Sequence, residues 1–108
     1  MVRLLEQYDV KITVAKKLSM IDVFGSSPPK VTKEIESICP RFKEGDSFIS
    51  EKGACPQGFC SWAFADIQRD IAHLRFGGSY PWMQEPGVAY SCCTDGLRPV
   101  IFRLERMR

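Results

Sequence analysis

One stretch of the chain decides the fold: SWAFADIQRDIAHLR, residues 61–75. Its apolar residues recur at helical spacing and form one stripe: Phe64, Ile67, Ile71 and Leu74. Its polar residues fall on the opposite side: Asp66, Arg69, Asp70 and His73. Such a pattern predicts an α-helix with one face packed on a sheet. We expect Ser61 to cap the start of this helix, and the glycines at 77 and 78 to end it.

Four segments around this helix alternate apolar and polar residues with the period of a β-strand. They cover residues 9–18, 47–50, 88–93 and 99–105, and Phe102 is expected to be buried in the last. The final two are joined through Asp95 and Gly96, a pair typical of a tight β-hairpin turn. Residues 33–36 are compatible with one turn of helix.

The order of these elements predicts an α+β fold. Two strands, a helix and a terminal hairpin offer too few parallel crossovers for a doubly wound sheet. We therefore predict a small antiparallel sheet with one main helix packed across a face. A chain of 108 residues, 44% hydrophobic, has the size and apolar content of one domain, so residues 1–108 are expected to form a single unit.

Charge and composition restrict the partners and the compartment. The formal net charge is +2, and basic residues alternate with acidic ones, so neither nucleic acid nor a membrane surface is an expected partner. No stretch approaches the roughly 18 apolar residues of a membrane helix, and the first residues lack the apolar run of a secretory signal. Five cysteines, two of them adjacent, suit a reducing compartment, and a cytoplasmic location is expected.

The cysteines carry the strongest chemical signal, since all five fall at expected element boundaries: Cys39, Cys55, Cys60, Cys92 and Cys93. Cys60 precedes the helix, where free backbone N–H groups stabilise a thiolate, so it is the most plausible reactive sulfur. Neighbouring strand residues point to opposite faces, so only one of Cys92 and Cys93 can share a site with Cys60. Cys55 and Cys60 have the spacing of a zinc-ligand pair, but no second such pair follows.

Other signatures are weaker. The single histidine, His73, excludes a zincin motif and is interpreted as a solvated surface residue, and no glycine-rich loop with a following lysine is present to bind phosphate. Trp62 and Trp82 either wall a pocket beside Cys60 or close a small core. Asp95 and Arg98 are the remaining pocket candidates, because the expected hairpin holds them together.

Three segments resemble a known family: GFCSWAF at 58–64, GGSYPW at 77–82 and CCTDGLRPV at 92–100. They are similar to an uncharacterised family of small bacterial and archaeal cysteine-containing proteins, over residues 10–106. The resemblance implies that Cys39, Cys60 and Cys93 are the shared sulfurs, whereas Cys55 is particular to this chain. It brings no established activity with it.

The leading hypothesis is a metal or iron–sulfur site made by Cys39, Cys60 and Cys93. Three protein ligands leave one position open, which would face Trp62 and Trp82 and take water or an unknown small molecule. One alternative is a non-enzymatic binding module or homo-oligomer that uses the aromatic surface and an exposed strand edge. Others are a thiol-redox protein, or sulfurs that only fill the core. The sequence does not decide whether the protein is an enzyme.

Overall fold

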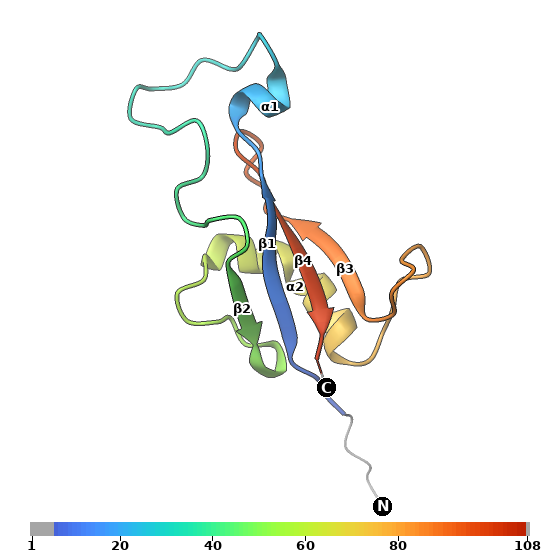
Figure 1. The fold of residues 1–108 in the computed structure, drawn as a ribbon. Coiled ribbons are helices and arrows are strands. Elements are labelled where there is room, and N and C mark those ends of the chain that lie inside the picture. Colours follow the sequence, from blue (N-terminus) through green and yellow to red (C-terminus); the bar gives the residue numbers. More distant parts are fainter. Residues whose placement is uncertain (1–5, 108) are drawn as a thin grey trace, which may run out of the picture.

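The computed structural model describes residues 6–107 and contains a four-stranded antiparallel sheet (Figure 1). The strands are β1 (Val10–Lys17), β2 (Ser47–Ser50), β3 (Val88–Cys92) and β4 (Val100–Arg106). Their order across the sheet is β2-β1-β4-β3, so the two longest strands are central and the two shorter strands form the edges. All three pairings are antiparallel. The predicted α+β fold is confirmed.

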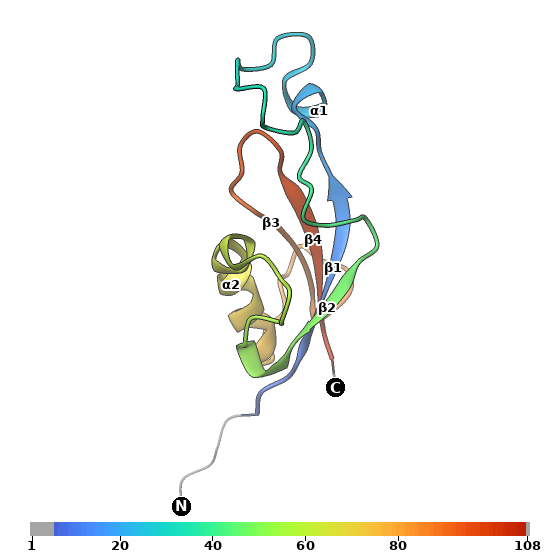
Figure 2. The ribbon, with the colours of Figure 1, turned by 90° about the vertical axis from the view of Figure 1, so that its left-hand side faces the viewer.

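Helix α2 (Ser61–Arg75) lies across one face of this sheet, and no helix of the described chain covers the opposite face (Figure 2). The apolar stripe expected from the sequence is buried, and it packs against inward-facing residues of β1 and β4 such as Ile12 and Phe102. Within residues 6–107, no helix combines the length and the apolar content needed to cross a membrane.

The ends of α2 confirm its predicted span and correct its cap. Cys60, in an extended conformation, is the N-cap residue, and Ser61 is the first residue inside the helix. The prediction that Ser61 caps the helix is therefore wrong by one residue. At the other end Gly77 has a φ of +94°, a conformation that favours glycine, and its N–H donates to the carbonyl of Leu74.

Asp70 is a second correction on this helix. It was expected on the solvent face, but only 6% of the residue is exposed. The hydroxyl of Tyr80 donates to Asp70 Oδ1 over 2.5 Å, and this bond replaces part of the hydration that the carboxylate loses on burial.

A long arm joins β1 to β2 and projects beyond the end of the sheet (Figure 1). It contains a short helix, α1 (Met20–Phe24), that the strand and helix periodicities did not predict. Ser19 Oγ accepts the N–H of Asp22, and the Asp22 carboxylate accepts the N–H of Ser19, which forms a capping box. The sequence motif Ser-x-x-Asp before an apolar pair could have predicted the start of this helix.

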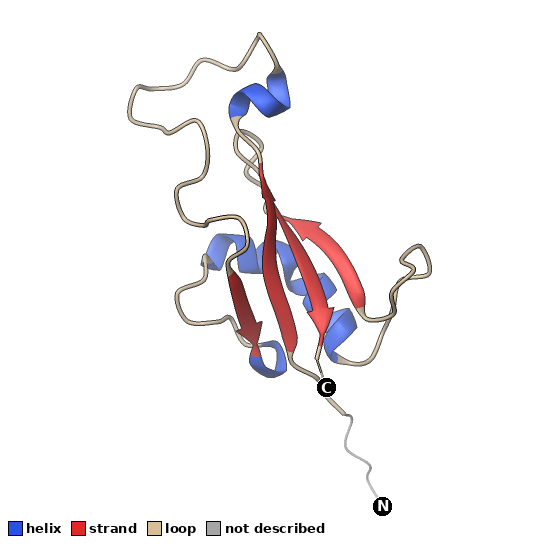
Figure 3. Ribbon diagram, viewed as in Figure 1, coloured by secondary structure: helices blue, strands red, loops and turns tan. Residues whose placement is uncertain are grey.

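The rest of the arm is irregular, as the colouring by secondary structure shows (Figure 3). The helical turn expected at residues 33–36 is not present. Instead, the N–H of Ile35 donates to the carbonyl of Thr32 over 3.4 Å, which makes a single turn that does not continue. The prolines at 28 and 29 disfavour helical backbone at the residues that precede them, and residues 27–30 belong to no helix or strand.

The connection between β3 and β4 also differs from its prediction. It runs from Cys93 to Pro99 and is longer than a two-residue turn. Gly96 does not have a positive φ, so the mirror-image turn expected at Asp95 and Gly96 is wrong. The Asp95 carboxylate accepts the N–H groups of Leu97 and Arg98 instead, at 3.0 and 3.2 Å, and thereby closes the loop.

Replacement of Phe102 by alanine tests the core. The ring is fully buried in β4 and contacts the rings of Phe42 and Phe59, with centroids 5.5 and 5.4 Å apart. We expect Phe102→Ala to lower the free energy of unfolding by about 3–5 kcal/mol, because a large cavity remains. Denaturant titration measures this loss. The matched variant Phe76→Ala removes a half-exposed ring and should cost about 1 kcal/mol or less. Equal losses in the two variants would contradict the assignment of Phe102 to the core.

Candidate functional site

Three of the five cysteines have the same degree of burial. Cys39 lies in the arm, Cys60 caps α2, and Cys93 directly follows β3. All three are half-buried and pack against the hydrophobic core. Cys55 and Cys92 are exposed. The structure therefore separates the predicted ligand set from the other two sulfurs.

The three segments that carry these cysteines are joined in pairs at one end of the sheet. Each link is a side-chain hydrogen bond between residues far apart in sequence. The links run from Arg41 Nη2 to the carbonyl of Phe59 (3.5 Å), from Trp62 Nε1 to Thr94 Oγ1 (3.1 Å), and from Arg98 Nη1 to the carbonyl of Glu36 (3.3 Å). Cys39, Cys60 and Cys93 are each within five residues of such a link along the chain. This region is called the cysteine end below.

The sulfurs of the cysteine end are not arranged as a preformed metal site. Among residues 6–107, no group of three or more histidine, cysteine, aspartate or glutamate side chains is placed to hold a metal ion. The side chain of Cys93 is engaged otherwise, since its Sγ accepts the N–H of Val100 over 3.3 Å. The three segments that carry the cysteines are therefore linked, but their sulfurs would have to move toward one another before they could coordinate a metal ion.

Cys60 is placed as the sequence predicts, at the start of α2. Its side chain makes no capping hydrogen bond, and no acidic residue occupies the first turn of the helix. The positive end of the helix dipole is therefore not neutralised by a carboxylate in that turn. Trp62, in the first turn of the helix, is 67% exposed, so it does not close a core. It remains at the cysteine end through its bond to Thr94.

Asp66 links α2 to the loop that follows Cys93. Its Oδ2 accepts both the backbone N–H and the hydroxyl of Thr94, at 2.7 and 2.9 Å. Its negative charge also acts on Cys92, whose pKa is raised above the ordinary value mainly by burial, then by the charges of Cys93 and Asp66. The sequence analysis did not select Asp66, because its partner lies 28 residues away along the chain.

Asp95 and Arg98 lie together, as predicted. Arg98 Nε is 3.3 Å from Asp95 Oδ2, and both side chains are partly shielded from solvent. The guanidinium also reaches the carbonyl of Glu36 in the arm. The pair therefore joins the β3–β4 loop to the segment that carries Cys39.

Trp82 is not at the cysteine end. It lies in the loop after the last turn of α2, whereas Trp62 lies in the first turn, so the two tryptophans cannot wall a common pocket within one chain. Trp82 is 73% exposed and stacks on Tyr80 with ring centroids 4.6 Å apart. Tyr80 stacks in turn on His73, which is exposed as expected. Both predicted roles of Trp82 are wrong.

Trp82 instead borders a groove that the sequence analysis missed. The groove, about 410 Å³ in volume, lies between α2, the loop after it and the edge strand β3. It is lined by Arg69, Asp70, Tyr80, Trp82, Ala89 and Tyr90. Burial and the bond to Asp70 raise the pKa of Tyr80. In the sequence, the groove was indicated only by Tyr80 and Trp82 in the loop together with Tyr90 in the strand.

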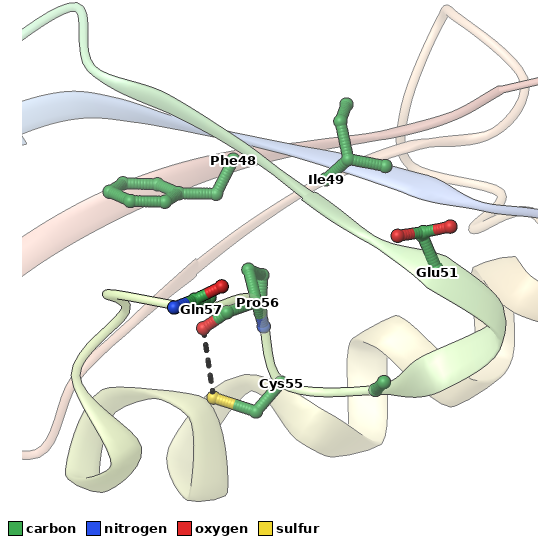
Figure 4. A pocket seen from close by; sticks show the side chains of 7 residues that line it. Phe48, Ile49, Glu51, Cys55, Pro56 and Gln57 are labelled. Atoms are coloured by element: carbon green, nitrogen blue, oxygen red, sulfur yellow. Dashed lines mark hydrogen bonds between the residues drawn. The ribbon is translucent and has the colours of Figure 1, made fainter.

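A second cavity, of about 350 Å³, lies beside β2 and contains Cys55 (Figure 4). It is lined by Phe48, Ile49, Glu51, Ala54, Cys55, Pro56 and Gln57. The Cys55 thiol lies 3.7 Å from the carbonyl of Pro56, the contact drawn in Figure 4. Burial, followed by the charge of Cys60, raises the pKa of Cys55. None of the predicted ligands lines this cavity.

The fold and the cysteine end define an α+β domain with a candidate thiol site. In the comparisons with known proteins, no family model, no curated protein and no solved structure matches the chain.

The charge of Asp66 gives a prediction for Cys92. In Asp66→Asn the amide oxygen still accepts from Thr94, but the negative charge that raises the pKa of Cys92 is gone. The pKa of Cys92 falls, a larger share of the thiol is ionised at neutral pH, and its alkylation should be faster. Peptide mass spectrometry after timed alkylation reads each cysteine separately. Cys55, whose pKa is raised by burial and by the charge of Cys60, is the internal control. An unchanged Cys92 rate contradicts this account of its pKa.

Proposed function

We propose that this protein binds a soft metal ion, zinc or the iron of an iron–sulfur cluster, through the thiolates of Cys39, Cys60 and Cys93. The observation that supports the proposal is the pairwise linkage of the three cysteine-bearing segments at one end of the sheet. Thiolates are preferred ligands of zinc and of iron–sulfur clusters. The family resemblance in the sequence points to the same three sulfurs.

Assembly of this site requires the three sulfurs to move toward one another. Cys39 and Cys93 lie outside helices and strands, and the Cys93 sulfur would have to give up its contact with the N–H of Val100. Cys60 stays fixed at the start of α2, where the helix dipole favours negative charge. The ion would draw the two loop sulfurs toward Cys60, and the free energy of binding would stabilise the arm against the sheet.

A second candidate function is binding or assembly without catalysis. It is supported by the groove beside β3 and by the exposure of Trp82 and Tyr90 at its border. Large aromatic side chains that remain exposed beside a strand edge are typical of a contact surface. The two candidates use different ends of α2 and do not exclude each other.

Metal content tests the first candidate. Protein purified without oxygen from cells supplied with zinc and iron should contain about one bound ion or cluster per chain. Cys60→Ser removes one of three ligands and should lower the retained metal by at least about tenfold. Cys55→Ser is the matched control, because Cys55 is on the same loop but outside the proposed set. Elemental analysis provides the reading, and circular dichroism checks folding. Metal far below one equivalent in folded wild-type protein would overturn the proposal.

Alkylation with and without a chelator distinguishes three roles for these cysteines: metal ligands, redox thiols and core residues. If the three sulfurs share an ion, Cys39, Cys60 and Cys93 should react slowly at first and become reactive together when a chelator is added. Fast reaction of Cys60 alone, without chelator, would support a redox thiol instead. If all three stay unreactive in both conditions while the protein is folded, they are core residues and the proposed site is wrong.

A further inference from the structure

Cys55 and Cys60 lie on either side of a closed β-turn. The turn spans residues 56–59, and the N–H of Phe59 donates to the carbonyl of Pro56 over 3.1 Å. Gly58 has a φ of +81°, the conformation that a type II turn needs at its third residue. Such a turn reverses the chain and holds its first and fourth Cα atoms within about 7 Å of each other. The residues just before and just after the turn are therefore carried on neighbouring segments.

The side chain of Cys55 points back toward the start of α2. Figure 4 shows its sulfur directed at the first turn of that helix, for which Cys60 is the N-cap residue. The charge of Cys60 also contributes, after burial, to the raised pKa of the Cys55 thiol. The two sulfurs are therefore close enough to interact.

Neither of these sulfurs is held in a strong hydrogen bond. Cys55 is exposed, and its Sγ lies 3.7 Å from the carbonyl of Pro56, a weak contact for a thiol donor. Cys60 is half-buried, and its side chain makes no capping hydrogen bond. Rotation of the two side chains toward each other therefore breaks no strong bond.

We propose that Cys55 and Cys60 form an intramolecular disulfide across this turn when the protein meets a peroxide. The sulfur of one thiol attacks a peroxide oxygen, the O–O bond breaks, and a sulfenic acid and one water form. The second thiol then attacks the sulfenic sulfur, the S–S bond forms, and a second water leaves. The two cysteines together lose two electrons and two protons, and one hydrogen peroxide is reduced to two waters.

This pair suits a disulfide better than the other cysteines do. A disulfide needs Cα atoms about 4.4–6.8 Å apart, a span similar to the one that a β-turn sets between its ends. Cys92 and Cys93 are adjacent at the end of β3, where neighbouring side chains point to opposite faces. The Sγ of Cys93 also accepts the N–H of Val100. Cys39 is separated from Cys55 by β2 and by the 3₁₀ helix that follows it, so no single turn joins them.

The disulfide gives the proposed metal site a redox control, and this consequence rests on the proposed function. Formation of the S–S bond removes the Cys60 thiolate from the ligand set and leaves Cys39 and Cys93 alone. Two thiolates are fewer than the three or four protein ligands of zinc sites, so oxidation should release the ion. A bound ion should in turn protect Cys60 from oxidation, because its sulfur is then engaged.

Peptide mass spectrometry tests the disulfide in the whole protein. Wild-type protein, as purified and after chelator treatment, is exposed to one equivalent of hydrogen peroxide, and the remaining thiols are then alkylated. In the chelator-treated sample Cys55 and Cys60 should be joined to each other, and dithiothreitol should restore both thiols. Cys92→Ser is the matched control and should form the same bond, whereas Cys55→Ser should leave Cys60 without a partner. Folded wild-type protein in which both sulfurs are free, over-oxidised or joined to other cysteines overturns the proposal.

A glycine substitution tests the role of the turn. Gly58→Ala introduces a side chain at a positive φ where the added Cβ meets no atom within 4 Å, so its effect is backbone strain alone. A strain of about 1 kcal/mol or more should slow disulfide formation by about fivefold or more. Gly45→Ala is the matched control, because Gly45 also has a positive φ and open space around it. The rate should not change in this control. Equal rates in the two variants contradict the part played by the turn.

Metal release separates this inference from the proposed function. Protein loaded with zinc should release it to a chromogenic chelator as the disulfide forms, and Cys55→Ser should release it more slowly at the same peroxide dose. Zinc that stays bound in wild-type protein without any disulfide leaves the metal site standing and removes the switch. A disulfide in protein that never binds zinc removes the metal site and leaves the bond across the turn.

Discussion

The structure depends on the contact between the apolar stripe of α2 and the sheet around Phe102. That ring lies in a central strand, is fully buried, and is surrounded by Phe42 from the arm and Phe59 from the loop before the helix. One aromatic cluster therefore joins the sheet to the later part of the arm and to the end of the loop before α2. Phe42 is three residues from Cys39 and Phe59 is next to Cys60, so the same packing that stabilises the fold also holds the segments of these two cysteines against the core.

Local patterns were sufficient to predict the regular elements. The spans of α2 and β2 match their predictions, because periodic apolar residues report directly on which face is buried. The errors occur where a side-chain hydrogen bond changes a local preference. Asp70 looks solvated from its own helix and is buried by Tyr80, while the loop at Gly96 is closed by the carboxylate of Asp95. Helix α1 was missed because five residues are too few for a periodic signal.

The candidate site was predictable only in part for the same reason. Cys60 and the pair Asp95 and Arg98 were placed correctly, since each depends on neighbours within a few residues. The position of Trp82 depends on the path of a loop after α2, which no sequence pattern defines. The link between Asp66 and Thr94 spans the helix and the β3–β4 loop, and it became visible only when the two were seen packed together.

The order of strands has a consequence for how the protein is made in the cell. Strands β1 and β4 come from opposite ends of the chain, and Val10 pairs with Arg106. The centre of the sheet therefore cannot form until the last strand has left the ribosome, since β1 has no central neighbour before then. The pairing of β1 with β4 joins residues separated by most of the described chain, so we expect this long-range contact to close late, after β2 and α2 have been synthesised.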